Sequence, residues 1–167
     1  MAANTKHIMA NAGSQKALDL LASQGFGVDQ SLDLDIPKLP RDITELDDED
    51  LIRLFQHINE FLKFVKVQVA CAQIDEGDSK KILEMKEAVV TVAHTVAKVT
   101  VASIKAKVAS DPDIMGLTDK YRAAHDYRKM MEMMMGNLEA DMSLVSRELT
   151  RRTSGASFKN RAGKFVV

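Results

Sequence analysis

The chain has 167 residues and a formal net charge of −1, and 46% of its residues are hydrophobic. This length is enough for one buried core and short for two domains. The single cysteine, Cys71, excludes a disulfide framework within one chain, and we interpret it as a small core residue in a reducing compartment. The net charge hides an asymmetry, because residues 29–50 hold nine acids and two bases, whereas residues 146–167 hold six bases and one acid. Head-to-tail contact between chains, a basic tail for polyanions and two solvated ends are all compatible with it.

Residues 1–46 are interpreted as an acidic, partly disordered N-terminal arm. Within it, Ser14 is a candidate N-cap and Gly25 a candidate stop for one short helix. The segment 26–39 and the following Pro40 predict an extended linker, because proline restrains the residue before it. We expect this arm to become ordered on a partner.

A helical core is predicted over residues 47–152. Its first long helix begins at the acidic cluster 47–50, where Asp47 can cap the helix and the next carboxylates favour its positive end. Apolar residues then recur at steps of four and three, which predicts a buried stripe on one helix face. This stripe comprises Leu51, Phe55, Ile58, Leu62, Val65, Val69 and Ala72.

The segment Gly77–Ser79 interrupts this phase and predicts a bend or a short break. Val and Thr are frequent in the segment 88–101, which leaves a strand open as an alternative, but 3,4 spacing favours helix. The next helical piece, 100–110, ends before Asp111 because the residue before a proline resists helical geometry. Behind the interruption, the apolar positions are Ile82, Met85, Val89, Val92, Val96 and Val99.

The last helix is predicted from Pro112 to about Arg152, with Asp111 as its cap. Its heptad-like stripe is interrupted only by Arg128, for which pairing with an acid on a neighbouring helix and extension to the helix edge both stay open. A stripe so long and narrow predicts packing against a hairpin partner, against copies of the chain, or both. The stripe comprises Ile114, Leu117, Tyr121, Ala124, Met131, Met135, Leu138, Met142, Val145 and Leu149.

Five methionines lie between residues 130 and 135 and spread around this helix. A helix that is apolar on more than one side favours contacts with more than one other helix. We therefore predict a homo-oligomer, with a ring as one form. Its expected interface comprises Leu117, Tyr121, Met131, Met134, Met135, Leu138 and Met142.

Membrane, metal and catalytic sites are not expected. The apolar segment 88–104 is short for a membrane span and contains Lys98. The four histidines share no metal-ligand spacing, and no phosphate-binding loop, nucleophile elbow or catalytic cysteine pairing is present. No signal peptide is visible. We therefore expect a cytoplasmic, non-enzymatic protein without a cofactor.

The basic end is the functional candidate. Arg147 and Arg151 are one helical turn apart and share a face, with Arg152 adjacent. Residues 153–167 are predicted to form a flexible basic tail with two phenylalanines. Because phosphates bind cations and bases stack on rings, the mixture suits single-stranded nucleic acid, although an ordinary disordered tail would look similar. The cations of the tail are Lys159, Arg161 and Lys164.

Four short motifs occur in the stretch 39–152: Leu39–Leu46, Lys98–Ala102, Asp111-Pro112 and Ser146–Arg152. With them, this stretch resembles the UvsY recombination mediators of tailed phages. The resemblance implies an accessory factor of the infected bacterial cytoplasm that binds single-stranded DNA, assembles as a ring and loads a recombinase onto strands covered by single-strand-binding protein. It also implies that Lys105 and Lys107 assist the three arginines in contacting phosphates.

We therefore expect an all-α fold, with a long antiparallel helical hairpin or coiled-coil-like bundle, an intermediate helical segment and flexible termini. The alternative function is that of a phage structural or DNA-packaging protein, such as a small terminase subunit or a head component, which would act through helical self-assembly. The lack of an evident helix-turn-helix disfavours the terminase.

Overall fold

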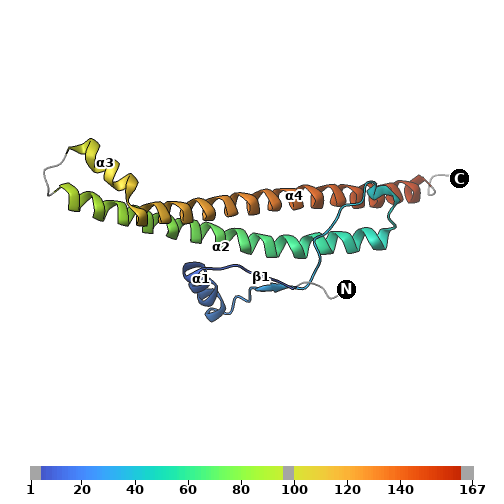
Figure 1. Cartoon of the computed structure of the whole chain (residues 1–167). Helices are drawn as coiled ribbons and strands as arrows, with labels where there is room; N and C mark the ends of the chain where they lie inside the picture. Colours follow the sequence, from blue (N-terminus) through green and yellow to red (C-terminus); the bar gives the residue numbers. More distant parts are fainter. Residues whose placement is uncertain (1–4, 96–99, 163–167) are drawn as a thin grey trace. The chain divides into compact units, whose positions relative to one another are not determined.

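A computed structural model describes residues 5–95 and 100–162 (Figure 1). Side chains are described as far as residue 154. The fold is all-α, as predicted, and a small two-stranded sheet that the sequence pattern does not predict accompanies the helices. The described helices are α1 (Ala12–Ser23), α2 (Asp48–Thr95), α3 (Val101–Ser110) and α4 (Pro112–Ala162), with the 3-10 turn η1 at Ile43–Glu45. The strands are β1 (Lys6–His7) and β2 (Ser31–Leu32).

The chain divides into two compact units. Unit 1 contains the residues up to Ile8, residues 29–66 and the residues from Met133 onward, and unit 2 contains residues 9–28 and 67–132. The helices α2 and α4 contribute a part to each unit.

Unit 1 is built on the first part of α2 and the last part of α4. The two segments run antiparallel, because Lys66 pairs with Glu139 at 2.9 Å whereas the earlier Asp48 pairs with the later Arg152 at 2.8 Å. Apolar residues of the predicted α2 stripe lie in this core, which confirms that part of the stripe. The buried core includes Leu51, Ile58, Phe61, Leu62, Phe64, Val65, Leu138 and Val145.

The N-terminal strands also belong to unit 1. Strands β1 and β2 pair antiparallel, with Lys6 opposite Leu32. A ring nitrogen of His57 on α2 lies 2.7 Å from the Asp35 carbonyl oxygen, and the Lys6 ammonium lies 5.8 Å from the centre of the Phe61 ring. This part of the predicted arm is therefore ordered against α2 of its own chain, which differs from the predicted ordering on a partner.

Side-chain caps mark the starts of three helices, as the sequence predicts for α2 and α4. The Asp47 carboxylate accepts the Asp50 N–H at 2.8 Å at the start of α2. Asp111 accepts the Asp113 and Ile114 N–H groups at 2.9 and 3.1 Å, directly before Pro112. At α3 the cap is Thr100, whose side chain accepts the Ser103 N–H.

Helix α1 belongs to unit 2 and begins earlier than predicted. Its N-cap is Asn11, and Ser14 is buried inside the first turn, where its hydroxyl donates to the Asn11 carbonyl at 3.2 Å. The predicted stop is confirmed, because Gly25 has φ +85° and donates its N–H to the Ala22 carbonyl. Phe26 donates to the Leu21 carbonyl, which completes a Schellman cap that favours glycine.

Within unit 2, polar contacts hold the α1 region on α2. The amide of Gln68 forms two hydrogen bonds with the backbone of Met9, at 2.7 and 2.8 Å, and Asp75 accepts the Asn11 N–H at 3.1 Å. Cys71 is buried, at 2% exposure, as predicted for a core residue. Burial, followed by the nearby Asp75 charge, raises the pKa of the Cys71 thiol.

Helix α2 continues through Gly77 without the predicted break. Because the helical repeat is unbroken, the buried side beyond residue 77 carries Leu83, at 9% exposure. The predicted stripe of this part is instead exposed, at 54% for Ile82, 70% for Met85, 66% for Val89 and 65% for Val92. Val96 and Val99 lie outside the described residues. We call the four exposed residues the outer stripe.

Helix α4 is longer than predicted, because its backbone remains helical to Ala162 rather than ending near Arg152. The predicted flexible tail therefore begins within this helix. The predicted stripe of α4 is confirmed as its covered side, since each of its positions from Ile114 to Leu149 is buried or half-buried.

Candidate functional site

The three arginines near the end of α4 differ in exposure. Arg147 is exposed, and no acid among the described side chains forms an ion pair with it. The Arg151 side chain is 67% exposed, whereas that of Arg152 is 19% exposed. The cationic face predicted from the spacing therefore contains two accessible arginines and one largely covered arginine.

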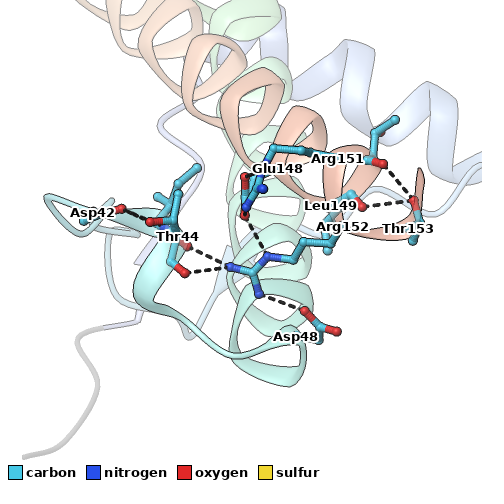
Figure 2. A network of polar contacts seen from close by, with 10 residues as sticks. Asp42, Thr44, Asp48, Glu148, Leu149, Arg151, Arg152 and Thr153 are labelled. Carbon is cyan, nitrogen blue, oxygen red and sulfur yellow. Dashed lines mark hydrogen bonds and ion pairs between the residues drawn. The ribbon is translucent and has the colours of Figure 1, made fainter. Parts of the chain in front are cut away.

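Glu148 lies at the centre of a network that joins Arg151 and Arg152 but not Arg147 (Figure 2). Arg151 donates its Nε–H to Oε2 and an Nη2–H to Oε1 of Glu148, both at 2.7 Å, which is the bidentate arrangement of a strong arginine–carboxylate pair. Arg152 donates its Nε–H to the same Oε1 at 2.7 Å. The Glu148 side chain is only 6% exposed.

Arg152 connects this carboxylate to two other elements of unit 1 (Figure 2). Its Nη1 donates to Asp48 in the first turn of α2 at 2.8 Å, and its Nη2 donates to the carbonyls of Ile43 and Thr44 in η1 at 3.3 and 3.1 Å. The guanidinium is thus occupied by acceptors of the chain itself. We interpret Arg152 as a structural residue rather than as the phosphate contact that is predicted from the sequence.

The network fixes the charge of its carboxylates. Hydrogen bonds from Arg151, and then from Arg152, lower the pKa of Glu148 from its usual 4.5 to about 2. Beside it, Asp42 accepts the Thr44 hydroxyl at 2.6 Å and the Thr44 N–H at 2.8 Å, and these bonds lower the pKa of Asp42. Both groups are therefore negatively charged near neutral pH.

Among the other predicted cations with described side chains, Arg147, Lys105 and Lys107 are not part of this network. Lys105 and Lys107 are exposed on α3, which belongs to unit 2, whereas the arginines belong to unit 1. Lys159 and Arg161 lie on the helical backbone of α4, but their side chains are outside the described part of the chain. Lys164 lies outside the described residues altogether. Among the predicted cations with described side chains, Arg151 and Arg152 share one partner, and Arg147 lies one helical turn before Arg151 on α4.

A cavity of about 780 Å³ lies in unit 2 between the end of α2, α3 and the start of α4. Its wall is mainly apolar, with Val101, Ile104 and Ile114 among its residues. Lys105 and Asp119 also line it, so charges of both signs border the apolar wall. The sequence pattern does not indicate this cavity.

The residues predicted as an oligomer interface lie on the side of α4 that the chain itself covers. Leu138 is 5% exposed and belongs to the core of unit 1, so it is not available to another copy, contrary to the prediction. The half-buried members are Leu117, Tyr121, Met131, Met134, Met135 and Met142. Met130 and Met133 are more exposed, at 59% and 56%.

Sequence reasoning misses two features of these surfaces. The first is the exposure of the outer stripe of α2, because its apolar 3-4-3 spacing after the interruption at Gly77 is equally typical of a buried side. The second is the central position of Glu148. Its signal is present in the sequence, because an acid three residues before Arg151 and four before Arg152 reaches both side chains on a helix.

Among the described side chains, no three His, Cys, Asp or Glu residues are grouped to hold a metal ion. Nor does any helix in residues 5–95 and 100–162 combine the length and apolar character that crossing a membrane requires. In comparisons with known proteins, no family model, curated protein or solved structure matches the chain.

Proposed function

We propose that this chain is a non-enzymatic accessory protein that binds single-stranded DNA as a homo-oligomer and assists the loading of a recombinase. The observation that carries the proposal is the pair of accessible arginines, Arg147 and Arg151, one helical turn apart on α4. Arginine is well suited to phosphate, because its planar fork of N–H groups matches the phosphate oxygens. The recombination part rests on the resemblance of residues 39–152 to UvsY mediators.

The two arginines have donors to spare for a phosphate backbone. Arg147 has no ion-pair partner among the described side chains, and Arg151 keeps both Nη1–H groups and one Nη2–H outside its pair with Glu148. Phosphate spacing along a strand allows such neighbouring cations to bind successive phosphates, so binding would depend steeply on salt.

The test is fluorescence anisotropy of the full chain with a labelled thymidine oligonucleotide at rising salt. We expect binding that weakens as salt rises, and the Arg147→Ala/Arg151→Ala variant should reduce the slope of log affinity against log salt by about 1.4, or about 0.7 per lost contact. Oligomer mass should stay unchanged. Absence of binding by the unaltered chain at low salt would end this proposal.

Arg122→Ala is the matched control. Arg122 is also an exposed arginine of α4, but it lies in unit 2 beside the cavity. Arg122→Ala removes the same charge as Arg147→Ala alone or Arg151→Ala alone, but it should leave the slope of log affinity against log salt nearly unchanged. An equal effect of all three arginines would indicate general attraction rather than a site.

A second candidate, a phage structural or packaging protein, is favoured by the outer stripe of α2. Four apolar side chains that are more than half exposed at 3-4-3 spacing suit packing against another helix. Self-association without any affinity for DNA would favour this candidate over the mediator.

A further inference from the structure

We propose that Glu148 is a positioning residue that holds Arg151 ready for a phosphate, while Arg152 anchors Glu148 and does not itself contact DNA. This inference rests on the proposed function. It follows from the contacts drawn in Figure 2, in which the exposed Arg151 and the largely covered Arg152 share the buried carboxylate of Glu148.

Backbone carbonyls of unit 1 hold the Arg152 side chain in place. Arg152 donates hydrogen bonds to the carbonyls of Ile43 and Thr44 and to Asp48. Its Nε–H donates to Oε1 of Glu148. Two segments far from α4 in sequence thus fix the Arg152 side chain. Because Glu148 is 6% exposed, its carboxylate has little freedom to turn away.

The fixed carboxylate then orients Arg151. Two parallel hydrogen bonds, both 2.7 Å long, set the plane of the Arg151 guanidinium relative to α4. The side chain remains 67% exposed, so its remaining N–H groups are accessible to a ligand. A side chain that is already ordered loses less conformational freedom on binding than a free arginine does.

This arrangement predicts an effect opposite to that of net charge. Removing an acid from a cationic surface ordinarily strengthens its attraction for DNA. Removing the Glu148 charge should instead weaken binding, because the orientation of Arg151 is lost. Asp141 provides the control, since it lies seven residues earlier on α4 and forms no ion pair with a described residue.

The experiment measures anisotropy of a labelled thymidine oligonucleotide with full-length variants that circular dichroism shows to be folded. Asp141→Asn should tighten binding by up to about twofold, whereas Glu148→Gln, with the same change in charge, should weaken it by about threefold or more. In the Arg151→Ala background, Glu148→Gln should have little further effect, because the two residues act as a pair.

Arg151→Lys leaves the Arg152–Glu148 hydrogen bond in place and tests the orientation of Arg151 independently. Lysine cannot form the bidentate pair, so this variant should bind nearly as weakly as Arg151→Ala. Equal tightening by Glu148→Gln and Asp141→Asn, or full binding by Arg151→Lys, would overturn the inference and leave the proposed function standing. An unaltered chain that does not bind the oligonucleotide would overturn both.

Discussion

Glu148 and Glu76 each accept hydrogen bonds from two nitrogen-bearing side chains. Glu148 in unit 1 accepts from Arg151 and Arg152, and Glu76 in unit 2 accepts from His125 at 2.8 Å and from Arg128. These bonds, that of His125 first, also lower the pKa of Glu76. Both carboxylates therefore stabilise the folded chain in their ionised form.

A prediction for pH follows from the sign of this shift. A carboxyl group with a lower pKa in the folded state stabilises the fold above its unfolded pKa, and the contribution is lost as pH falls through the folded pKa. For Glu148 this window runs from about 4.5 down to about 2. The melting temperature of the unaltered chain should therefore exceed that of Glu148→Gln near neutral pH, and the difference should shrink across the window. Thermal melts from pH 6 to pH 2 measure it, and a difference independent of pH would contradict it.

Single residues show how far sequence reasoning reaches. Of the two alternatives that stay open for Arg128 in the sequence, the structure shows pairing with an acid on a neighbouring helix, since Arg128 bonds to Glu76 of α2 with both side chains mostly buried. The identity of that acid could not be predicted, because 52 residues separate the two and no local spacing links them. In contrast, the contacts of Glu148 with both arginines are local to α4 and could have been read from i+3 and i+4 spacing.

At the scale of elements, the starts of α2 and α4 are predictable because an aspartate side chain closes the first turn in each. The phase of α2 after residue 77 is not. A glycine inside a helix lowers stability without enforcing a break, and an unbroken 3.6-residue repeat brings Leu83 to the covered side instead of Ile82. Whether a helix breaks depends on tertiary contacts that local sequence does not record.

The continuity of α2 predicts that Gly77→Ala stabilises the chain. An added Cβ at residue 77 meets no atom within 4 Å, and alanine favours helix over glycine by about 1 kcal/mol. Denaturant unfolding should therefore show an increase in the free energy of unfolding of roughly 0.5–1 kcal/mol. A decrease would indicate that the backbone at this position is not regular helix.

Gly25→Ala is the opposite control for this substitution. An added Cβ there also meets no atom, but φ is +85°, which alanine adopts at a cost of about 1 kcal/mol. The free energy of unfolding should fall by about that amount. The two glycines thus separate the effect of backbone angle from the effect of space.

At the scale of the whole molecule, the position of the outer stripe bears on self-association. The side of α4 predicted to meet other copies is covered by the chain itself, whereas Val89 and Val92 are two-thirds exposed in a stretch, 88–95, without Asp, Glu, Lys or Arg. A second copy of the chain would supply a helix of matching apolar spacing. We therefore expect copies to associate through α2 rather than through the methionines of α4.

Val89→Lys tests this assignment. A lysine in an apolar helix contact loses hydration without gaining a partner, so it should shift the mass measured by light scattering toward the monomer by at least tenfold in dissociation constant. Met133→Lys, at a comparably exposed position on α4, should leave the mass unchanged. The reverse result would return the interface to the methionines, and a monomeric unaltered chain would remove the oligomer from the proposal.

Composition and periodicity were sufficient for the helical class but not for the sites. An apolar stripe looks the same in sequence whether its own chain or another molecule covers it, so the covered stripe of α4 and the outer stripe of α2 could not be told apart. Cations likewise look the same whether they face solvent, as Arg147 does, or hold the chain together, as Arg152 does.

The buried position of Cys71 gives the protein a built-in reporter. It is the sole thiol of the chain and is 2% exposed, and the raised pKa keeps it in the less reactive protonated form. A thiol-specific reagent can reach it only when unit 2 opens locally. The labelling rate of the unaltered protein therefore reports how readily unit 2 opens around Cys71. A ligand that stabilises the closed state slows this labelling, so its binding can be detected without an attached dye or an engineered residue.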